Sequence, residues 1–207
     1  MIKRFIWDLD GTILDGDFSR EEELFKEYLS EEEFRKFKEL RYSLLHTYEK
    51  EYTRYDKKML SKHLSNGCNA NINEELIDKW INYASSINEC IHPGVVEVLD
   101  YLNDRGIENV IYSNWFIKTQ VGRLKKLGLD LYFKEIIGAD YHMKPSKEGF
   151  LSACGLYKPS ECVMIGDNYD KDILGARNAG LNTIYYSPKK EVDVPHIKSL
   201  VKIKEMY

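Results

Sequence analysis

The chain has 207 residues, which is enough for one globular domain, or for one domain that carries a modest insertion. Hydrophobic residues make up 43% of it and charged residues 31%, proportions that exclude a disordered or a membrane-embedded protein. The net charge of -4 is not gathered in long blocks. Because binding to a phosphate backbone requires a basic face, we expect no nucleic-acid partner.

Two further features bear on where the protein works. No apolar run approaches the roughly 20 residues that a membrane helix needs, and the run before Asp8 is too short for a secretory signal. The four cysteines show no Cys-x-x-Cys spacing, and we interpret them as free thiols in a reducing compartment: Cys68, Cys90, Cys154 and Cys162. The sequence therefore predicts a cytoplasmic protein without a membrane partner.

The predicted elements begin with a short apolar strand at residues 5–7. Four later runs have the same form: residues 110–112, 136–137, 163–165 and 183–186. Short apolar runs without alternation are typical of strands buried on both faces, as in a parallel sheet. Helical periodicity separates these runs after Pro93, from Ile117 to Leu127 and around Ile173. Strands that alternate with helices predict a doubly wound α/β domain.

Residues 15–90 have a different pattern, with helical periodicity throughout and no convincing strand. Ser30 and Glu33 form a capping box at the start of one helix, and Asn73 is placed to cap another. The pair Asn66-Gly67 predicts a turn between helical segments.

This pattern predicts an all-helical insert that follows the first strand of the sheet. Such an insert emerges beside the carboxyl end of that strand, where open α/β sheets bind their ligands. We therefore predict a catalytic core made of residues 1–14 and 91–207, and a helical cap made of residues 15–90.

The first chemical motif is Asp8-Leu9-Asp10-Gly11-Thr12, directly after the first strand. Two carboxylates at this spacing converge when the chain turns, and Gly11 permits a tight turn. They suit Mg²⁺, which prefers oxygen ligands, and they also suit a division into nucleophile and general acid/base. The alternative is an ordinary Asp-Gly turn with a helix cap at Thr12.

A second acidic group follows the strand at residues 163–165. It contains Asp167, Asp170 and Asp172. Taken alone, these residues are adequately explained as caps of the next helix, where the helix dipole favours acids. Because acidic residues end two buried strands far apart in the sequence, a shared metal site becomes the better hypothesis.

Three further polar residues follow other predicted strands. Ser113 and Asn114 end the strand at residues 110–112, and their hydroxyl and amide groups suit phosphoryl oxygens. Lys144 follows the strand at residues 136–137, and its charge is suited to neutralise a nucleophile or a phosphate. Each is commonplace in isolation, since most lysines are simply solvated.

In combination, the order and spacing of these residues resemble the four motifs of the haloacid dehalogenase superfamily. The resemblance covers nearly the whole chain and extends to His92-Pro93-Gly94 and to residues 172–180. The insert resembles the cap that phosphoglycolate phosphatase-like members carry between the first and second motifs. The resemblance implies a Rossmann-like, doubly wound parallel sheet with an inserted all-helical cap.

The resemblance also implies roles for the acidic residues. Asp8 would be the nucleophile and a Mg²⁺ ligand. Asp10 would be the general acid/base, with its backbone carbonyl on the metal, and Asp167 would complete the protein ligands. Asp172 would stabilise these ligands without binding the metal directly, although the spacing of the motif also allows Asp170 in this role.

The remaining motif residues would act on the phosphoryl group. Ser113, with Asn114, would bind it, and Lys144 would neutralise charge around it and around Asp8. Thr12 would help to orient Asp10.

The implied function is Mg²⁺-dependent hydrolysis of a small phosphorylated metabolite. Dehalogenation is disfavoured, because the acid at position 10 belongs to phosphoryl transfer in this superfamily. A phosphomutase of the same family is the alternative, followed by a catalytically silent binding module. The substrate stays open among sugar phosphates, nucleotides and phosphoglycolate, as does the oligomeric state. Cap cations such as Arg41, Arg54 and Lys58 either contact the substrate or form a solvated face.

Overall fold

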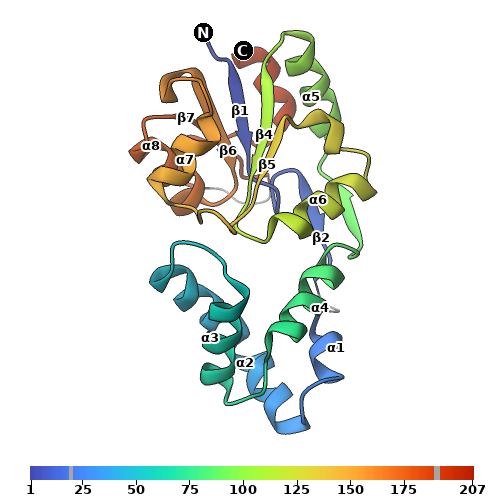
Figure 1. Cartoon of the computed structure of the whole chain (residues 1–207). Coiled ribbons are helices and arrows are strands. Elements are labelled where there is room, and N and C mark those ends of the chain that lie inside the picture. Colours follow the sequence, from blue (N-terminus) through green and yellow to red (C-terminus); the bar gives the residue numbers. More distant parts are fainter. Residues whose placement is uncertain (19–20, 189–191) are drawn as a thin grey trace.

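The computed structural model describes residues 1–18, 21–188 and 192–207. Its centre is a parallel sheet of five strands in the order β5-β4-β1-β6-β7 (Figure 1). The strands are β1 (Arg4–Trp7), β4 (Glu108–Tyr112), β5 (Glu135–Ile137), β6 (Cys162–Gly166) and β7 (Asn182–Tyr185). All five correspond to the apolar runs of the sequence, so the predicted parallel sheet is confirmed.

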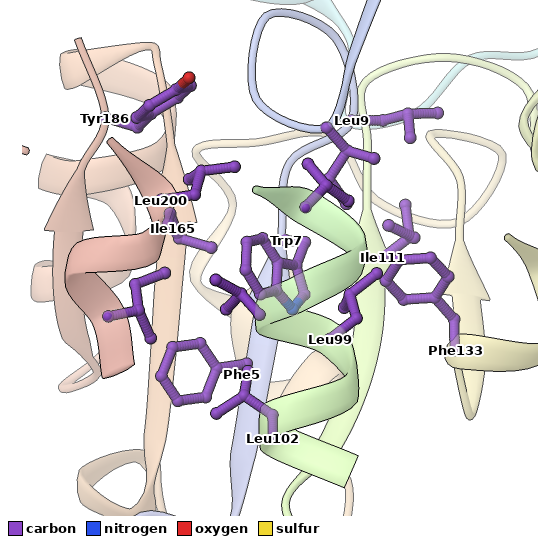
Figure 2. Packing of buried hydrophobic residues seen from close by; sticks show 14 of the residues in the cluster. Phe5, Trp7, Leu9, Leu99, Leu102, Ile111, Phe133, Ile165, Tyr186 and Leu200 are labelled. Carbon is purple, nitrogen blue, oxygen red and sulfur yellow. The ribbon is translucent and has the colours of Figure 1, made fainter. Parts of the chain in front are cut away.

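Helices cover both faces of this sheet. The core helices are α5 (Val95–Asp104), α6 (Ile117–Lys126), α7 (Lys147–Cys154), α8 (Gly175–Asn178) and α9 (Ile203–Met206). Phe5 and Trp7 of β1 pack on one face with α5 and α9, as Figure 2 shows for Phe5, Trp7 and Leu99. Ile6, between them in the strand, points to the opposite face and packs with Phe150 of α7. This two-sided burial confirms the doubly wound fold class.

In the described part of the insert after the first strand there are four helices: α1 (Glu21–Lys26), α2 (Glu31–Glu51), α3 (Lys57–Cys68) and α4 (Glu74–Ala84). Their shared core is aromatic, with Phe25 stacked on Phe37 and Trp80 edge-on to both. The capping box of Ser30 and Glu33 is present at the start of α2. The helical character of the insert is therefore confirmed (Figure 1).

The predicted turn at Asn66-Gly67 is wrong, because both residues lie inside α3. The helix ends instead at Cys68, and Asn69, its C-cap residue, adopts a left-handed conformation with φ of 52°. Gly67 has a packing role, since a Cβ atom there would lie 2.3 Å from a methyl carbon of Leu44 in α2. Glycine at this position lets two helices approach closely.

The prediction of no strand in residues 15–90 is also wrong at both ends of that range. Leu14–Gly16 (β2) pairs in antiparallel fashion with Glu89–Ile91 (β3), so a two-stranded ribbon closes the base of the insert. Each strand has three residues, too few to show the alternation by which strands are recognised in a sequence.

The insert also contacts the core at a second place, through the loop that follows β5. The Met143 N–H donates to the Thr53 carbonyl at 2.9 Å, and the Tyr55 N–H donates to the Ala139 carbonyl at 2.8 Å. Met143 and Ala139 belong to the same apolar cluster as the aromatic core of the insert. The division of the chain into two domains at the predicted boundaries stays a prediction.

Among the described residues, no helix combines the length and the apolar character that crossing a bilayer requires.

Candidate active site

Three of the predicted site residues follow neighbouring strands of the sheet. Asp8 comes directly after β1, Ser113 directly after β4 and Asp167 directly after β6. Trp7, the last residue of β1, pairs in register with Ile111 of β4 and Ile165 of β6. The parallel sheet therefore brings these side chains together at one edge, where ligands bind in open α/β sheets.

Gly11 brings the first and last motifs into contact. Its φ of 77° lies in the left-handed region that favours glycine, and a Cβ atom there would lie 2.4 Å from Oδ2 of Asp167. No larger residue fits this turn without displacing Asp167.

Lys144 lies between two carboxylates in the interior of the site. Its Nζ donates to Asp8 Oδ1 at 2.5 Å and to Asp172 Oδ1 at 2.7 Å, and the residue is only 3% exposed. Burial by itself would lower the pKa of Lys144, but the charges of Asp172 and Asp8 outweigh it and raise that pKa. Lys144 is therefore held as a cation against Asp8.

The acidic cluster has the composition of a cation site. Asp8, Asp167 and Asp172 each offer a carboxylate oxygen within 4.8 Å of the others. Burial raises the pKa of Asp8 and of Asp167, and the charge of Asp172 adds to both effects. Three carboxylates and one ammonium group leave an excess of negative charge that a bound cation relieves. Hard oxygen donors of this kind fit Mg²⁺.

The two candidates for the last acid differ in surroundings. Asp172 is fully buried, and its two oxygens accept hydrogen bonds from Lys144 Nζ and from the Asn168 N–H. Asp170 is exposed in the π-helical segment Tyr169–Leu174. Asp172 is therefore held inside the protein by hydrogen bonds to both of its oxygens, whereas Asp170 is not.

The two predicted phosphate-binding residues have hydrogen bonds within the protein. Gln120 Nε2 donates to Ser113 Oγ at 2.7 Å in a buried contact. Asn114 donates to the Lys144 carbonyl at 3.0 Å and accepts from the Lys144 N–H at 2.7 Å. Asn114 therefore fixes the backbone that carries Lys144, and phosphate binding by either residue stays a prediction.

Arg123 of α6 is a site residue that the sequence reasoning missed. It contacts both carboxylate oxygens of Asp10, at 3.1 and 2.5 Å, although its own side chain is 1% exposed. The Thr12 hydroxyl, expected to orient Asp10, is buried without a hydrogen bond among the described residues. In the sequence Arg123 stands close to Lys125 and Lys126, and such a group resembles a solvated helix end.

A cavity of about 210 Å³ adjoins Asp10 between insert and core. The insert contributes Trp80 and Glu21 to its wall, and the core contributes Trp115 and Arg123. Burial raises the pKa of Glu21, and the Arg41 charge opposes that rise. The wall of the cavity beside Asp10 therefore combines aromatic and charged side chains.

The proposed cap cations fall into two groups. Arg41 is 2% exposed and lies 3.8 Å from a Glu21 oxygen and 3.6 Å from a Glu22 oxygen, so its charge is balanced inside the insert. Arg54 and Lys58 are exposed, and Arg54 lines a different cavity.

Comparison with known proteins gives the chain relatives among phosphatases. The pyrophosphatase PpaX of Anoxybacillus flavithermus is 28% identical over 194 residues, which cover 88% of this chain and 82% of the relative. The ribulose-1,5-bisphosphate 5-phosphatase of Halopiger xanaduensis is 29% identical over 118 residues, 55% of this chain and 48% of the relative. The phosphoglycolate phosphatase of Caulobacter vibrioides is 35% identical over 99 residues, 46% of this chain and 41% of the relative. The match thus spans less than half the length of the last two relatives.

Solved structures establish the same fold. The hydrolase YfnB of Bacillus subtilis, in its magnesium-bound form, aligns with 99% of this chain and 98% of its own, with a TM-score of 0.70 and 23% identity. A phosphatase from Thermococcus onnurineus aligns over 99% and 97% of the two chains, with a TM-score of 0.64 and 23% identity. A sequence model of the haloacid dehalogenase-like hydrolases matches residues 2–180, which is most of the chain. The protein therefore belongs to the haloacid dehalogenase-like hydrolase family.

Proposed function

We propose that this hydrolase is a Mg²⁺-dependent phosphatase of small phosphomonoesters, with Asp8 as the nucleophile and Asp10 as the general acid/base. Relatives that are named phosphatases support the reaction class. The residues of the site support the division of roles.

One observation carries the proposal: Asp8 and Asp10 share a turn but have different surroundings. Asp8 has a side chain only 10% exposed and lies against Lys144 in the acidic cluster. The Asp10 side chain is 41% exposed and borders the cavity. Pairs of carboxylates whose environments differ in this way divide the work of nucleophile and acid/base between them.

The reaction then has two displacements at phosphorus. An Asp8 carboxylate oxygen attacks phosphorus, the bond from phosphorus to the ester oxygen breaks, and Asp10 gives that oxygen a proton as the alcohol leaves. Asp10 next takes a proton from water, whose oxygen attacks phosphorus. The bond to Asp8 breaks, and inorganic phosphate leaves.

Mg²⁺ would be held by Asp8 and Asp167, with the Asp10 carbonyl, and would supply positive charge to the phosphoryl oxygens. Lys144 adds positive charge at Asp8 and keeps the carboxylate in place. The cavity beside Asp10 is the place for the leaving alcohol.

The proposal is tested by measuring phosphate release from a panel of sugar phosphates, nucleotides, phosphoglycolate and p-nitrophenyl phosphate. A phosphatase releases inorganic phosphate in amounts equal to the alcohol formed. A phosphomutase would instead isomerise its substrate and release little phosphate. Absence of turnover with every ester, at saturating Mg²⁺, would remove the proposal.

Metal removal gives a first prediction. We expect EDTA to abolish phosphate release and added Mg²⁺ to restore it, because the acidic cluster repels an anionic substrate when no cation is bound. Ca²⁺ should restore little activity, since its longer bonds and higher coordination number misplace nucleophile and phosphate. Full activity in EDTA would show that the acidic cluster holds no catalytic metal.

A second prediction separates the two candidates for the last acid. Asp172→Asn should weaken Mg²⁺ binding or turnover about 10–100-fold, the usual cost of losing a partner that supports metal ligands. Asp170→Asn is the matched control and should behave like the wild type, because Asp170 is exposed. Calorimetric Mg²⁺ titration and kcat measure the two effects. Equal losses in both variants would contradict the assignment.

A further inference from the structure

The guanidinium group of Arg123 makes four hydrogen bonds, and a close ion-pair contact with Glu89 adds a fifth interaction. Nη1 and Nη2 donate to the two oxygens of Asp10 at 3.1 and 2.5 Å. Nε donates to Glu89 Oε1 at 2.7 Å, and Nη2 lies 2.5 Å from the same oxygen. Nη1 also donates to Gln120 Oε1 at 2.8 Å. The guanidinium group is therefore fixed in position and in rotation.

The network is buried except where it meets the cavity. The side chains of Arg123 and Glu89 are 1% and 0% exposed, whereas that of Asp10 is 41% exposed. Burial by itself would lower the pKa of Arg123, but Asp10 and Glu89 raise it, so the group stays charged. Asp10 thus presents its carboxylate to the cavity while the buried, charged guanidinium group of Arg123 holds it from the protein side.

The two parallel hydrogen bonds also fix the plane of the Asp10 carboxylate. A planar guanidinium matches a carboxylate with two bonds, whereas an ammonium group offers a single point of charge. Proton transfer requires this control, because the acid must lie within hydrogen-bonding reach of the ester oxygen.

The same network reaches the residue predicted to bind the phosphoryl group. Gln120, one turn before Arg123 on α6, donates to Ser113 Oγ at 2.7 Å. One side of the network therefore holds Asp10, and the other holds Ser113. Glu89, in β3 at the end of the insert, holds Arg123 in place.

We propose that Arg123 is the positioning residue for the acid/base carboxylate, fixing Asp10 directly and its spacing from Ser113 through Gln120. The inference rests on the proposed function, because it assigns Arg123 to the proton transfers of Asp10. The competing role is a structural brace between α6 and β3 that has no connection with catalysis.

Two esters distinguish these roles. An alkyl phosphate needs a proton on its leaving oxygen, whereas p-nitrophenolate leaves without one. Both esters need Asp10 again, to take a proton from the water that attacks the phosphorylated Asp8. A misplaced Asp10 therefore slows both steps for the alkyl ester, but only the second step for p-nitrophenyl phosphate.

The test variant is Arg123→Lys, which keeps the charge and loses the paired hydrogen bonds. With the most active alkyl ester of the panel, we expect kcat to fall about tenfold or more, with little change in KM. With p-nitrophenyl phosphate, rapid mixing should show a burst of p-nitrophenolate equal to the enzyme concentration, followed by slow turnover. Arg105→Lys, at an exposed arginine of the core, is the control and should match the wild type.

The double variant and the wild-type protein decide between the two roles. In the double variant Asp10→Asn/Arg123→Lys, the loss should be no larger than in Asp10→Asn alone, because both changes remove one function. If the losses of the two single variants multiply in the double variant, the proposal is overturned. If Arg123→Lys instead slows the first step and the later turnover equally for both esters, Arg123 is a structural brace and the proposal is likewise overturned. Thermal unfolding of each variant reports the fold separately. A wild-type protein without activity on either ester would remove the proposed function itself.

Discussion

Asp8→Asn should abolish phosphate release while leaving the fold intact. The amide has nearly the shape of the carboxylate but is no nucleophile toward phosphorus. Burial raises the pKa of Asp8, which means that the buried position disfavours a charged side chain. The neutral amide of asparagine avoids this cost, so the fold should tolerate the change. The measurement is kcat with p-nitrophenyl phosphate and the melting temperature of the same sample.

The covalent intermediate provides the direct check. Rapid quenching of the wild-type reaction in acid, followed by peptide mass spectrometry, should find the phosphoryl group on Asp8. Asp10→Asn is the comparison, with an expected loss of about 100-fold or more in kcat but an intact nucleophile. Substantial turnover by pure Asp8→Asn protein would remove the central role given to this residue.

Lys144→Met should cost both activity and stability. The change leaves Asp8 and Asp172 facing one another in the interior without their shared cation. Removing one partner of a buried ion pair costs about 3–5 kcal/mol in the free energy of unfolding. Loss of one preorganised charge next to the reacting group should lower kcat about 100–1,000-fold. Urea unfolding in EDTA and steady-state kinetics measure the two effects.

The stability loss should depend on pH in a definite direction. A carboxyl group whose pKa is higher in the folded state than in the unfolded state destabilises the fold increasingly as the pH rises. Burial already raises the pKa of Asp8, and loss of Lys144 removes the charge that opposes this rise. The loss in the free energy of unfolding caused by Lys144→Met should therefore be smaller at about pH 5 than at about pH 7. Lys147→Met, at an exposed lysine of α7, should show no deficit at either pH.

Much of the core fold was predictable because its strands are buried on both faces. Each of the five apolar runs is a strand of the sheet, and residues that pair in register lie far apart in sequence. The β2–β3 ribbon was not predictable, because three-residue strands carry no period. The turn predicted at Gly67 was wrong because the sequence alone does not distinguish a glycine that turns the chain from one that packs against a neighbouring helix, as Gly67 does against Leu44.

The site was predictable as far as its residues follow strand ends. Asp8, Ser113 and Asp167 meet because neighbouring parallel strands end at one edge, and Lys144 joins them from the loop after β5. Arg123 lies in the last turn of α6, where its direction depends on how the helix packs, and the sequence does not distinguish it from the solvated Lys125 and Lys126 beside it. Their roles in catalysis stay predictions.

The hydrogen bonds between the insert and the loop after β5 bear on whether the insert can be removed from this enzyme. The Thr53 carbonyl accepts from the Met143 N–H, one residue before Lys144, so the segment that carries the lysine is partly anchored outside the sheet. Excising residues 15–90 would cut that anchor and expose the apolar side chains of Phe116 and Met143. A shortened chain that keeps every motif residue would therefore lack part of the support that holds its lysine in place.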